Sequence, residues 1–402
     1  MEALSFVSII EKDKHDTITT SWVYPGFPAE YNQVLINRGQ FQGTIDPPLI
    51  FSRYAGLWHY TYTFNVGSES LDIMDTSLIR FTTVASVTVG SKHFYPERYF
   101  PIVKLLAQMY LDEKGRPLKI LQSVLNLASE GTITFRDQEV TPPSFDEEKK
   151  SLLKTPLTDV TDMFGVQSIL LWHALLTKRS VLVKSDNLGK LLNLIRAFPL
   201  FVFHRQDWTM LRPFITAHDT ELQDLSFRKR TSADDVEGGA GDDDEDEKSS
   251  SSSSSSKKSK GKKGRHSNET RHTGVVCGTC DSAVEALGVW DVIADMETGK
   301  VTVREASEDR DDDSEVPLVG PVFEMTPFHK EAAAIVKKSQ SQKELVTGLT
   351  NLTVKLTERV SEIKEELEGK PITPNNVKEL LGAASMATCR FLVDLYKAET
   401  SN

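Results

Sequence analysis

Five consecutive side chains that can make directed polar contacts follow an apolar run in the middle of the chain. The run is "FPLFVF", and the residues after it are His204, Arg205, Gln206, Asp207 and Trp208. Together they supply hydrogen-bond donors, acceptors and both signs of charge. Such groups suit recognition of a partner surface, where tryptophan and arginine carry much of the binding energy. They form the candidate binding site of this chain.

The position of these residues depends on a strand that the sequence predicts over Leu200–His204. In open α/β sheets, ligands bind beyond the carboxyl ends of parallel strands, and residues 204–208 would lie at such an end. A local role is the alternative. Trp208 would then fill the core, and Asp207 would cap a turn or pair with Arg205.

Other residues that often carry chemistry are weaker candidates. The "CGTC" stretch has the spacing of half a zinc site, but Cys389 stands alone and no histidine lies near it at finger spacing. Cys277 and Cys280 are therefore expected to be incidental thiols in a strand region. His173, within "LLWHALL", is expected to be a core histidine with satisfied hydrogen bonds.

The known signatures of bond-making chemistry do not occur in this sequence. There is no glycine-rich loop of the kind that cradles phosphates, no G-x-S-x-G and no H-E-x-x-H. The sequence therefore predicts no catalytic residue, no cofactor and no metal ion.

The composition indicates a soluble globular protein with an acidic surface. Among 402 residues, 47 Lys and Arg stand against 58 Asp and Glu, for a formal net charge of −11. This balance argues against nucleic acid as a ligand, because phosphate binding needs clustered basic residues. No apolar run approaches the roughly 18 residues of a membrane helix. The 3 cysteines fit a reducing compartment, and we expect a cytoplasmic protein.

The sequence of the first part of the chain predicts a small α+β module over residues 1–140. Strand-like runs in the first 65 residues indicate an antiparallel meander, and a further strand is expected near Leu78–Thr88. A helix follows, with an apolar face that should cover the sheet. The residues of that face are Tyr99, Ile102, Val103, Leu106 and Tyr110. The segment Val140–Lys150 is the expected linker.

A second module, of α/β type, is expected after the linker. "VQSILLWHALLTK" predicts a central helix because it is apolar nearly all round, and "RSVLVKS" predicts a buried strand. Ser185 or Asp186 would cap the next helix, which Pro199 would end. With the strand "LFVFH" this pattern indicates a βαβ unit with parallel strands. "GVVCGTC", "GVWDVIADM" and "KVTVRE" look like further strands.

Low-complexity sequence interrupts the second module. Residues 229–270 hold an acidic run, eight consecutive serines and a basic run, with too few apolar residues to form a core. We therefore expect a disordered insertion there and a shorter loop at Ser307–Glu315. The module is thus expected to consist of residues 150–228 and 271–402, and its last part is helical.

A long helix between Lys343 and Glu368 carries one apolar stripe. Its leucine, valine and isoleucine residues recur at spacings of four and three, which is typical of a helix that packs along another helix. Candidates for contact with a partner helix are Leu349, Leu352, Leu356 and Ile363. The alternative is that the stripe packs on the second module.

The segment "LLWHALLTKRSVLVKSDNLGKLLNLIRAFPLFVFHRQDWTMLRPFI" resembles the central lobe of the DENN domain family. The resemblance is strongest over Leu152–Ile215 and weak over the first 50 residues, and residues 229–270 match nothing in the family pattern. It implies an α/β protein, in which an α+β longin-like N-terminal module precedes an α/β DENN lobe with a helical C-terminus.

The same resemblance implies an exchange factor for a Rab GTPase, which would sit between the two lobes and contact residues 204–208. A similar member of the family is associated with late endosomes and with a coiled-coil-rich endosomal recycling complex. An exchange factor makes no covalent bond, because it weakens GDP binding by preferring the nucleotide-free GTPase. The alternative is a non-catalytic scaffold subunit of that complex. Membrane contact would be indirect, through partners.

Overall fold

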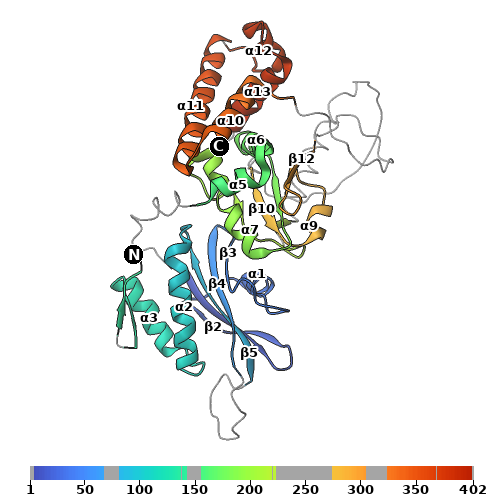
Figure 1. The fold of residues 1–402 in the computed structure, drawn as a ribbon. Coiled ribbons are helices and arrows are strands. Elements are labelled where there is room, and N and C mark those ends of the chain that lie inside the picture. The colour runs from blue at the N-terminus through green and yellow to red at the C-terminus, as the bar shows by residue number, and fades with distance from the viewer. Residues whose placement is uncertain are drawn as a thin grey trace, which may run out of the picture.

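Two sheet-containing parts and a set of C-terminal helices make up the structure (Figure 1). This computed structural model describes residues 4–67, 81–136, 138–142, 155–219, 221–222, 274–304, 324–367 and 369–400. We call the described residues up to 142 the first lobe and those from 155 onward the second lobe. Each lobe contains a five-stranded sheet, which confirms the predicted α/β class.

The sheet of the first lobe is antiparallel, with the strand order β2-β1-β5-β4-β3. Its strands, rich in β-branched and aromatic residues, are β1 (Phe6–Asp13), β2 (Ile18–Tyr24), β3 (Leu49–Tyr54), β4 (Leu57–Asn65) and β5 (Thr82–Ser91). The predicted meander is wrong, because the hairpins β1-β2 and β3-β4 do not pair with each other. Both pair instead with β5, which lies between them.

Helices cover both faces of this sheet. They are α1 (Glu30–Arg38), α2 (Pro96–Asp112) and α3 (Leu118–Ser129), followed by the short hairpin of β6 (Ile133–Phe135) and β7 (Gln138–Val140). The predicted apolar face of α2 is confirmed, since all five of its residues are buried against the sheet. A separate apolar cluster packs α1 on the opposite face.

The second sheet is mainly parallel, with the order β12-β11-β8-β10-β9. Its strands are β8 (Val181–Lys184), β9 (Leu211–Arg212), β10 (Val276–Thr279), β11 (Val292–Asp295) and β12 (Lys300–Val303). β8 runs parallel to both β10 and β11, and β12 closes the edge as the antiparallel partner of β11. The strands expected from "RSVLVKS", "GVVCGTC", "GVWDVIADM" and "KVTVRE" are confirmed.

The helices of the second lobe lie around this sheet. They are α5 (Leu157–Phe164), η2 (Gly165–Gln167), α6 (Ser168–Leu176), α7 (Leu188–Ile195), η3 (Phe198–Arg205) and α9 (Ser282–Ala286). The central position expected for α6 is confirmed, because nearly all of its side chains are buried. Within it, His173 Nδ1 lies 3.0 Å from His329 Nε2, and burial lowers the pKa of His173, so the core assignment is also correct.

The strand predicted over Leu200–His204 is wrong, and with it the proposed βαβ unit. These residues belong to η3, a 3-10 helix with a kink at Val202, and Pro199 lies inside it instead of ending α7. A short, fully buried apolar run has no period that separates a strand from a buried helix. The parallel partners of β10 are β8 and the later, two-residue β9.

The last helices of the described residues are α10 (Pro327–Lys338), α11 (Gln342–Glu366), α12 (Pro374–Leu381) and α13 (Met386–Thr400). Side-chain oxygens of Thr326, Ser341 and Thr373 cap the first three at their N-termini. None of the described helices is both long and apolar enough to cross a membrane.

Several sequence expectations fall outside the described residues. They are the linker beyond residue 142, the insertion at 229–270, the loop at 307–315 and the start of the strand expected at Leu78. The division into residues 1–140, 150–228, 229–270 and 271–402 therefore stays a prediction.

Candidate functional site

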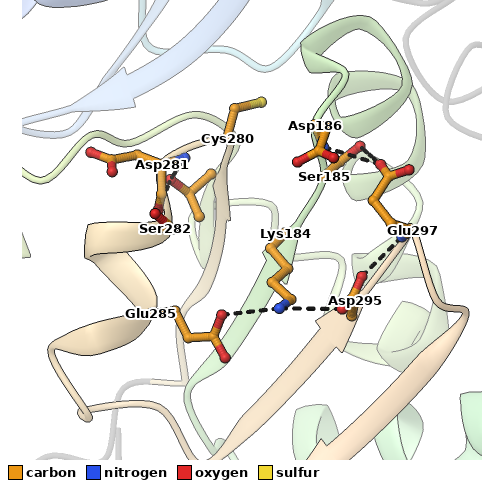
Figure 2. A pocket seen from close by; sticks show the side chains of 10 residues that line it. Lys184, Ser185, Asp186, Cys280, Asp281, Ser282, Glu285, Asp295 and Glu297 are labelled. Atoms are coloured by element: carbon orange, nitrogen blue, oxygen red, sulfur yellow. Dashed lines mark hydrogen bonds and ion pairs between the residues drawn. The ribbon is translucent and has the colours of Figure 1, made fainter.

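A pocket opens at the carboxyl ends of three parallel strands of the second sheet (Figure 2). β8, β10 and β11 run in the same direction, so the residues after each strand meet at one edge, where open α/β sheets bind ligands. The pocket has a volume of about 350 Å³. It is lined by Lys184, Ser185, Asp186, Thr279, Cys280, Asp281, Ser282, Glu285, Asp295 and Glu297.

Turns after the strands bring these side chains into the pocket. Asn187, not the predicted Ser185 or Asp186, caps α7 by accepting a hydrogen bond from the Lys190 N–H at 2.8 Å. Asp281 caps α9 in the same way. β10 leads into the turn before α9. It lies so close to neighbouring backbone that one of its positions, Gly278, requires glycine.

A Cβ atom on Gly278 would lie 2.2 Å from the carbonyl oxygen of Pro213. Only glycine allows the two chain segments to approach so closely. The residue before Thr279 and Cys280 therefore lets this strand end lie against the segment that follows β9.

The pocket has a negative lining of five carboxylates and one ammonium group. Lys184 Nζ lies 3.0 Å from Glu285 Oε2 and 3.2 Å from Asp295 Oδ2, and the hydrogen bond to Glu285 is the main cause that raises the pKa of Lys184. Burial opposes ionisation of Asp295, but the hydrogen bonds it accepts outweigh this and lower its pKa. The other three carboxylates leave the rim acidic.

The groups of this pocket favour recognition over covalent chemistry. Burial, followed by the charges of Asp186 and Glu297, raises the pKa of the Cys280 thiol to about 11. A protonated thiol is a poor nucleophile. The part of the chain that the structure describes contains no group of three side chains placed to hold a metal ion. Carboxylates in such a rim can accept charge-assisted hydrogen bonds from basic side chains.

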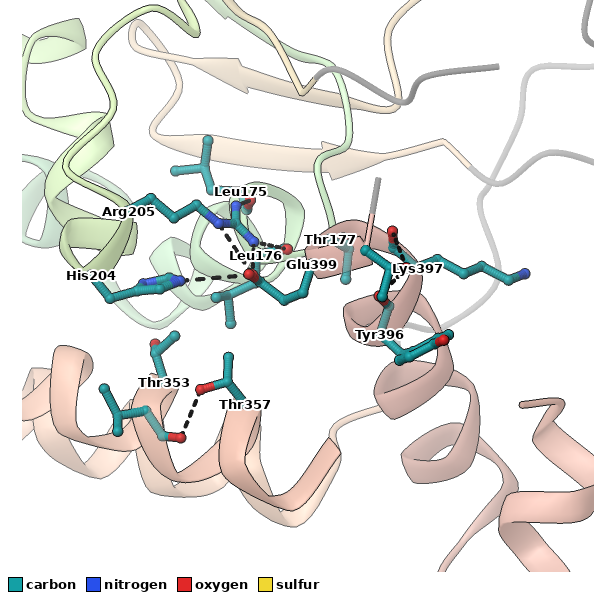
Figure 3. A network of polar contacts seen from close by, with 12 residues as sticks. Leu175, Leu176, Thr177, His204, Arg205, Thr353, Thr357, Tyr396, Lys397 and Glu399 are labelled. Carbon is teal, nitrogen blue, oxygen red and sulfur yellow. Dashed lines mark hydrogen bonds and ion pairs between the residues drawn. The ribbon is translucent and has the colours of Figure 1, made fainter. Parts of the chain in front are cut away.

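The predicted binding residue Arg205 points into the protein (Figure 3). Its Nη1 and Nη2 atoms donate to the carbonyl oxygens of Leu175 and Leu176, each at 2.7 Å. Its guanidinium also pairs with Glu399, with Nε 3.2 Å from Oε1, and His204 Nε2 lies 3.8 Å from the same oxygen. Arg205 therefore joins η3, the C-terminus of α6 and α13, and the expected alternative pairing with Asp207 is not formed.

The last three residues of the predicted group separate from one another. Gln206 is exposed and has a left-handed backbone with φ 47°. Asp207 Oδ1 accepts a hydrogen bond from the Thr209 N–H at 2.7 Å, so it caps a turn. Trp208 is buried, with its ring centroid 6.4 Å from that of Phe203. Contact with a partner stays a prediction for this group, in which Gln206 is the exposed member.

Two arginines of the first lobe contact the second lobe at the edge strands β3 and β9. Arg53 Nη1 donates to the Thr209 carbonyl oxygen at 2.9 Å. Arg38 Nη2, from the end of α1, lies 3.3 Å from Asp219 Oδ1. Sequence reasoning missed this junction, because single charged residues distant along the chain leave no periodic signal.

The apolar stripe of α11 lies inside the protein. The four partner-helix candidates Leu349, Leu352, Leu356 and Ile363 are each at most 3% exposed and belong to the main core. They are enclosed because α11 packs against η3, α10 and α13. In this structure they cannot reach a partner helix, so the alternative of packing on the second lobe is correct.

Comparison with known proteins finds relatives that share one name. The chain is 26% identical over 416 aligned positions to DENN domain-containing protein 10 of Dictyostelium discoideum, a match that covers 98% of this chain and 97% of that protein. Proteins of the same name from Danio rerio and Homo sapiens are each 26% identical, over 56% and 54% of this chain and 62% and 60% of their own lengths. No family model matches the chain. The resemblance to the DENN domain family is confirmed by these relatives, and the chain is a homologue of the proteins named DENN domain-containing protein 10.

Proposed function

We propose that the protein is a guanine nucleotide exchange factor for a Rab GTPase in late endosomal or endosomal recycling traffic. The observation that carries this proposal is the acidic pocket at the carboxyl edge of the second sheet, beside the first lobe. Gly189, in the first turn of α7 next to the pocket, lies against Pro47 of the first lobe. A GTPase that covered the pocket would therefore contact both lobes.

The chemistry of the pocket supports exchange by binding alone. Its carboxylates would receive basic side chains of the GTPase, and opposite charges at a rim accelerate association. Tighter binding of the nucleotide-free GTPase weakens GDP binding by the same factor, because coupling between two ligands is reciprocal. No group of this chain has to form or break a bond in such a reaction.

The proposal is tested by release of mantGDP from a panel of purified Rab proteins. With the full-length chain at micromolar concentration, we expect at least a tenfold faster release from one or a few members of the panel. Release that stays at the intrinsic rate for every Rab would reject the exchange proposal.

Charge reversal at the rim of the pocket should separate binding from folding. Asp186 is exposed there, and among the described residues its carboxylate takes part in no ion pair. We expect Asp186→Lys to reduce kcat/KM for exchange about tenfold or more, because like charges in an interface repel. The melting temperature should change little. Glu358→Lys, an equal charge change at an exposed site of α11, is the matched control and should leave exchange unaffected.

The alternative, a scaffold subunit of a coiled-coil-rich endosomal recycling complex, would need a surface other than the buried stripe of α11. The helices α10 to α13 extend beyond the second sheet (Figure 1), and their outer faces would be available to it. Recovery of coiled-coil subunits together with intrinsic-rate mantGDP release would favour this function.

A further inference from the structure

Charged groups from both lobes converge where strand β3 approaches strand β9. Arg53 Nη1 and Arg212 Nη1 both donate to the Thr209 carbonyl oxygen, at 2.9 and 2.8 Å. Arg212 Nε also lies 3.2 Å from Glu221 Oε1. Burial, followed by the charge of Arg212, lowers the pKa of Arg53 to about 10, and the carboxylates of Glu221 and Asp207 oppose this shift.

Arg38 lies between two carboxylates at this junction and makes a hydrogen bond with neither. The residue is 1% exposed, and its Nη1 donates to the Arg53 carbonyl oxygen at 2.9 Å. Its Nη2 atom is 3.3 Å from Asp219 Oδ1 and 3.8 Å from Glu221 Oε2. It makes a hydrogen bond with neither oxygen.

Several buried polar atoms at this junction therefore make no hydrogen bond. Within the described structure, the buried atoms that lack a hydrogen-bond partner here are Arg38 Nε and Nη2, Arg53 Nε, Asp219 Oδ1 and Glu221 Oε2. Buried polar groups in folded proteins are normally paired. The opposite charges already face each other, so a small displacement of one lobe would complete one ion pair and lengthen the other.

We propose that the junction of β3 and β9 is a hinge with two positions, in which Arg38 pairs with Asp219 in one and with Glu221 in the other. Each position keeps one charge-assisted hydrogen bond, so the two can be close in free energy. The ion pair between Arg196 and Glu97, 2.6 Å long, is a separate contact between the lobes that does not involve these groups. A partner that bridges the lobes would select one position. The hinge is a property of the chain itself and does not depend on exchange activity.

Distances between spin labels on the full-length chain test this hinge without any partner. Cys280→Ser removes the exposed native thiol, and Cys277 and Cys389 are buried. Labels at Lys104→Cys on α2 and Ala286→Cys on α9 report across the junction, and both positions are exposed. The control pair, Lys104→Cys with Gln122→Cys on α3, stays within the first lobe.

Pulsed electron paramagnetic resonance should give a cross-lobe distance distribution that is broader than the control or has two maxima. Two isosteric changes, Asp219→Asn and Glu221→Gln, each remove one negative charge, and each should shift the distribution toward a single, different maximum. A cross-lobe distribution as narrow as the control in the unsubstituted junction would overturn the hinge. A broad distribution that neither change affects would overturn the role of Arg38.

Discussion

Replacing Leu352 or Leu356 by aspartate should unfold the C-terminal helices. The two side chains are 3% and 1% exposed, in the contact of α11 with its neighbours. Truncation of a buried leucine costs about 2–5 kcal/mol, and a carboxylate without a partner in the same place adds to that loss. The sum is comparable with the total stability of many domains, about 5–15 kcal/mol. Melting followed by circular dichroism should show a fall of roughly 10 °C or more, or no cooperative transition.

Val354→Asp is the matched control for this experiment. Val354 lies on the same helix but is 40% exposed, so the same substitution there should change stability by no more than about 0.5 kcal/mol. If Leu352→Asp melted like the unsubstituted protein, the stripe would not be core. Contact of the stripe with a partner helix would then regain support.

The stripe of α11 and the face of α2 were predictable because a helix with one buried face repeats its apolar residues every three to four positions. Each of the five expected α2 residues is buried, and α11 begins and ends within two residues of the expected bounds. Periodicity states which residues are buried but not by what. This is why the sequence left open whether α11 packs internally or on a partner.

The residues after His204 show where local patterns stop being informative. "FPLFVF" is apolar at every position, so its pattern has no period that distinguishes a strand from the 3-10 helix that forms. The partner of Arg205 is Glu399, 194 residues further along the chain. A pairing over that distance is set by the packing of η3 on α6 and α13, so the sequence could supply the charged group but not its role.

Part of the pocket could be predicted from the sequence. The strands that end at Lys184, Thr279 and Asp295 were expected, and polar residues follow each of them. Their assembly at one edge depends on β8 lying between β10 and β11, although a long stretch of sequence separates β8 from both. Sheet order of this kind is a tertiary property, and no single segment encodes it.

Removing the guanidinium of Arg205 should destabilise the second lobe by about 2–3 kcal/mol, the usual cost of breaking a buried, charged hydrogen-bond network. Arg205→Ala removes the side-chain donor to the Leu176 carbonyl oxygen and leaves Glu399 without its main countercharge, whereas the Leu175 carbonyl oxygen keeps the Lys178 N–H at 3.3 Å. Loss of one partner from a buried, charged hydrogen-bond network leaves the other groups unpaired. Arg205→Lys should recover only part of the loss, because an ammonium group cannot span the three acceptors as the planar fork does. Urea unfolding of the three proteins measures the difference.

The same network predicts a pH dependence with a defined sign. Burial alone would raise the pKa of Glu399, but contacts with His204 and Arg205 outweigh burial and lower it to about 2 from an ordinary 4.5. A carboxyl group with a lowered pKa in the folded state contributes stability above its unfolded pKa. That contribution is lost as the pH falls from about 4.5 toward 2. In Glu399→Gln, this part of the acid destabilisation should be absent.

Arg359→Ala provides a control that distinguishes a structural Arg205 from one that contacts a GTPase. Arg359 makes ion pairs with Glu362 and Glu366 on the surface of α11, and such pairs contribute at most about 1 kcal/mol. If Arg205→Ala were as mild as Arg359→Ala and still reduced mantGDP release, the guanidinium would act on the partner and not on the fold. From the contacts of Arg205 with α6 and α13, we expect a large loss of stability in Arg205→Ala but not in Arg359→Ala. The exchange rate of the folded fraction of Arg205→Ala should stay unchanged.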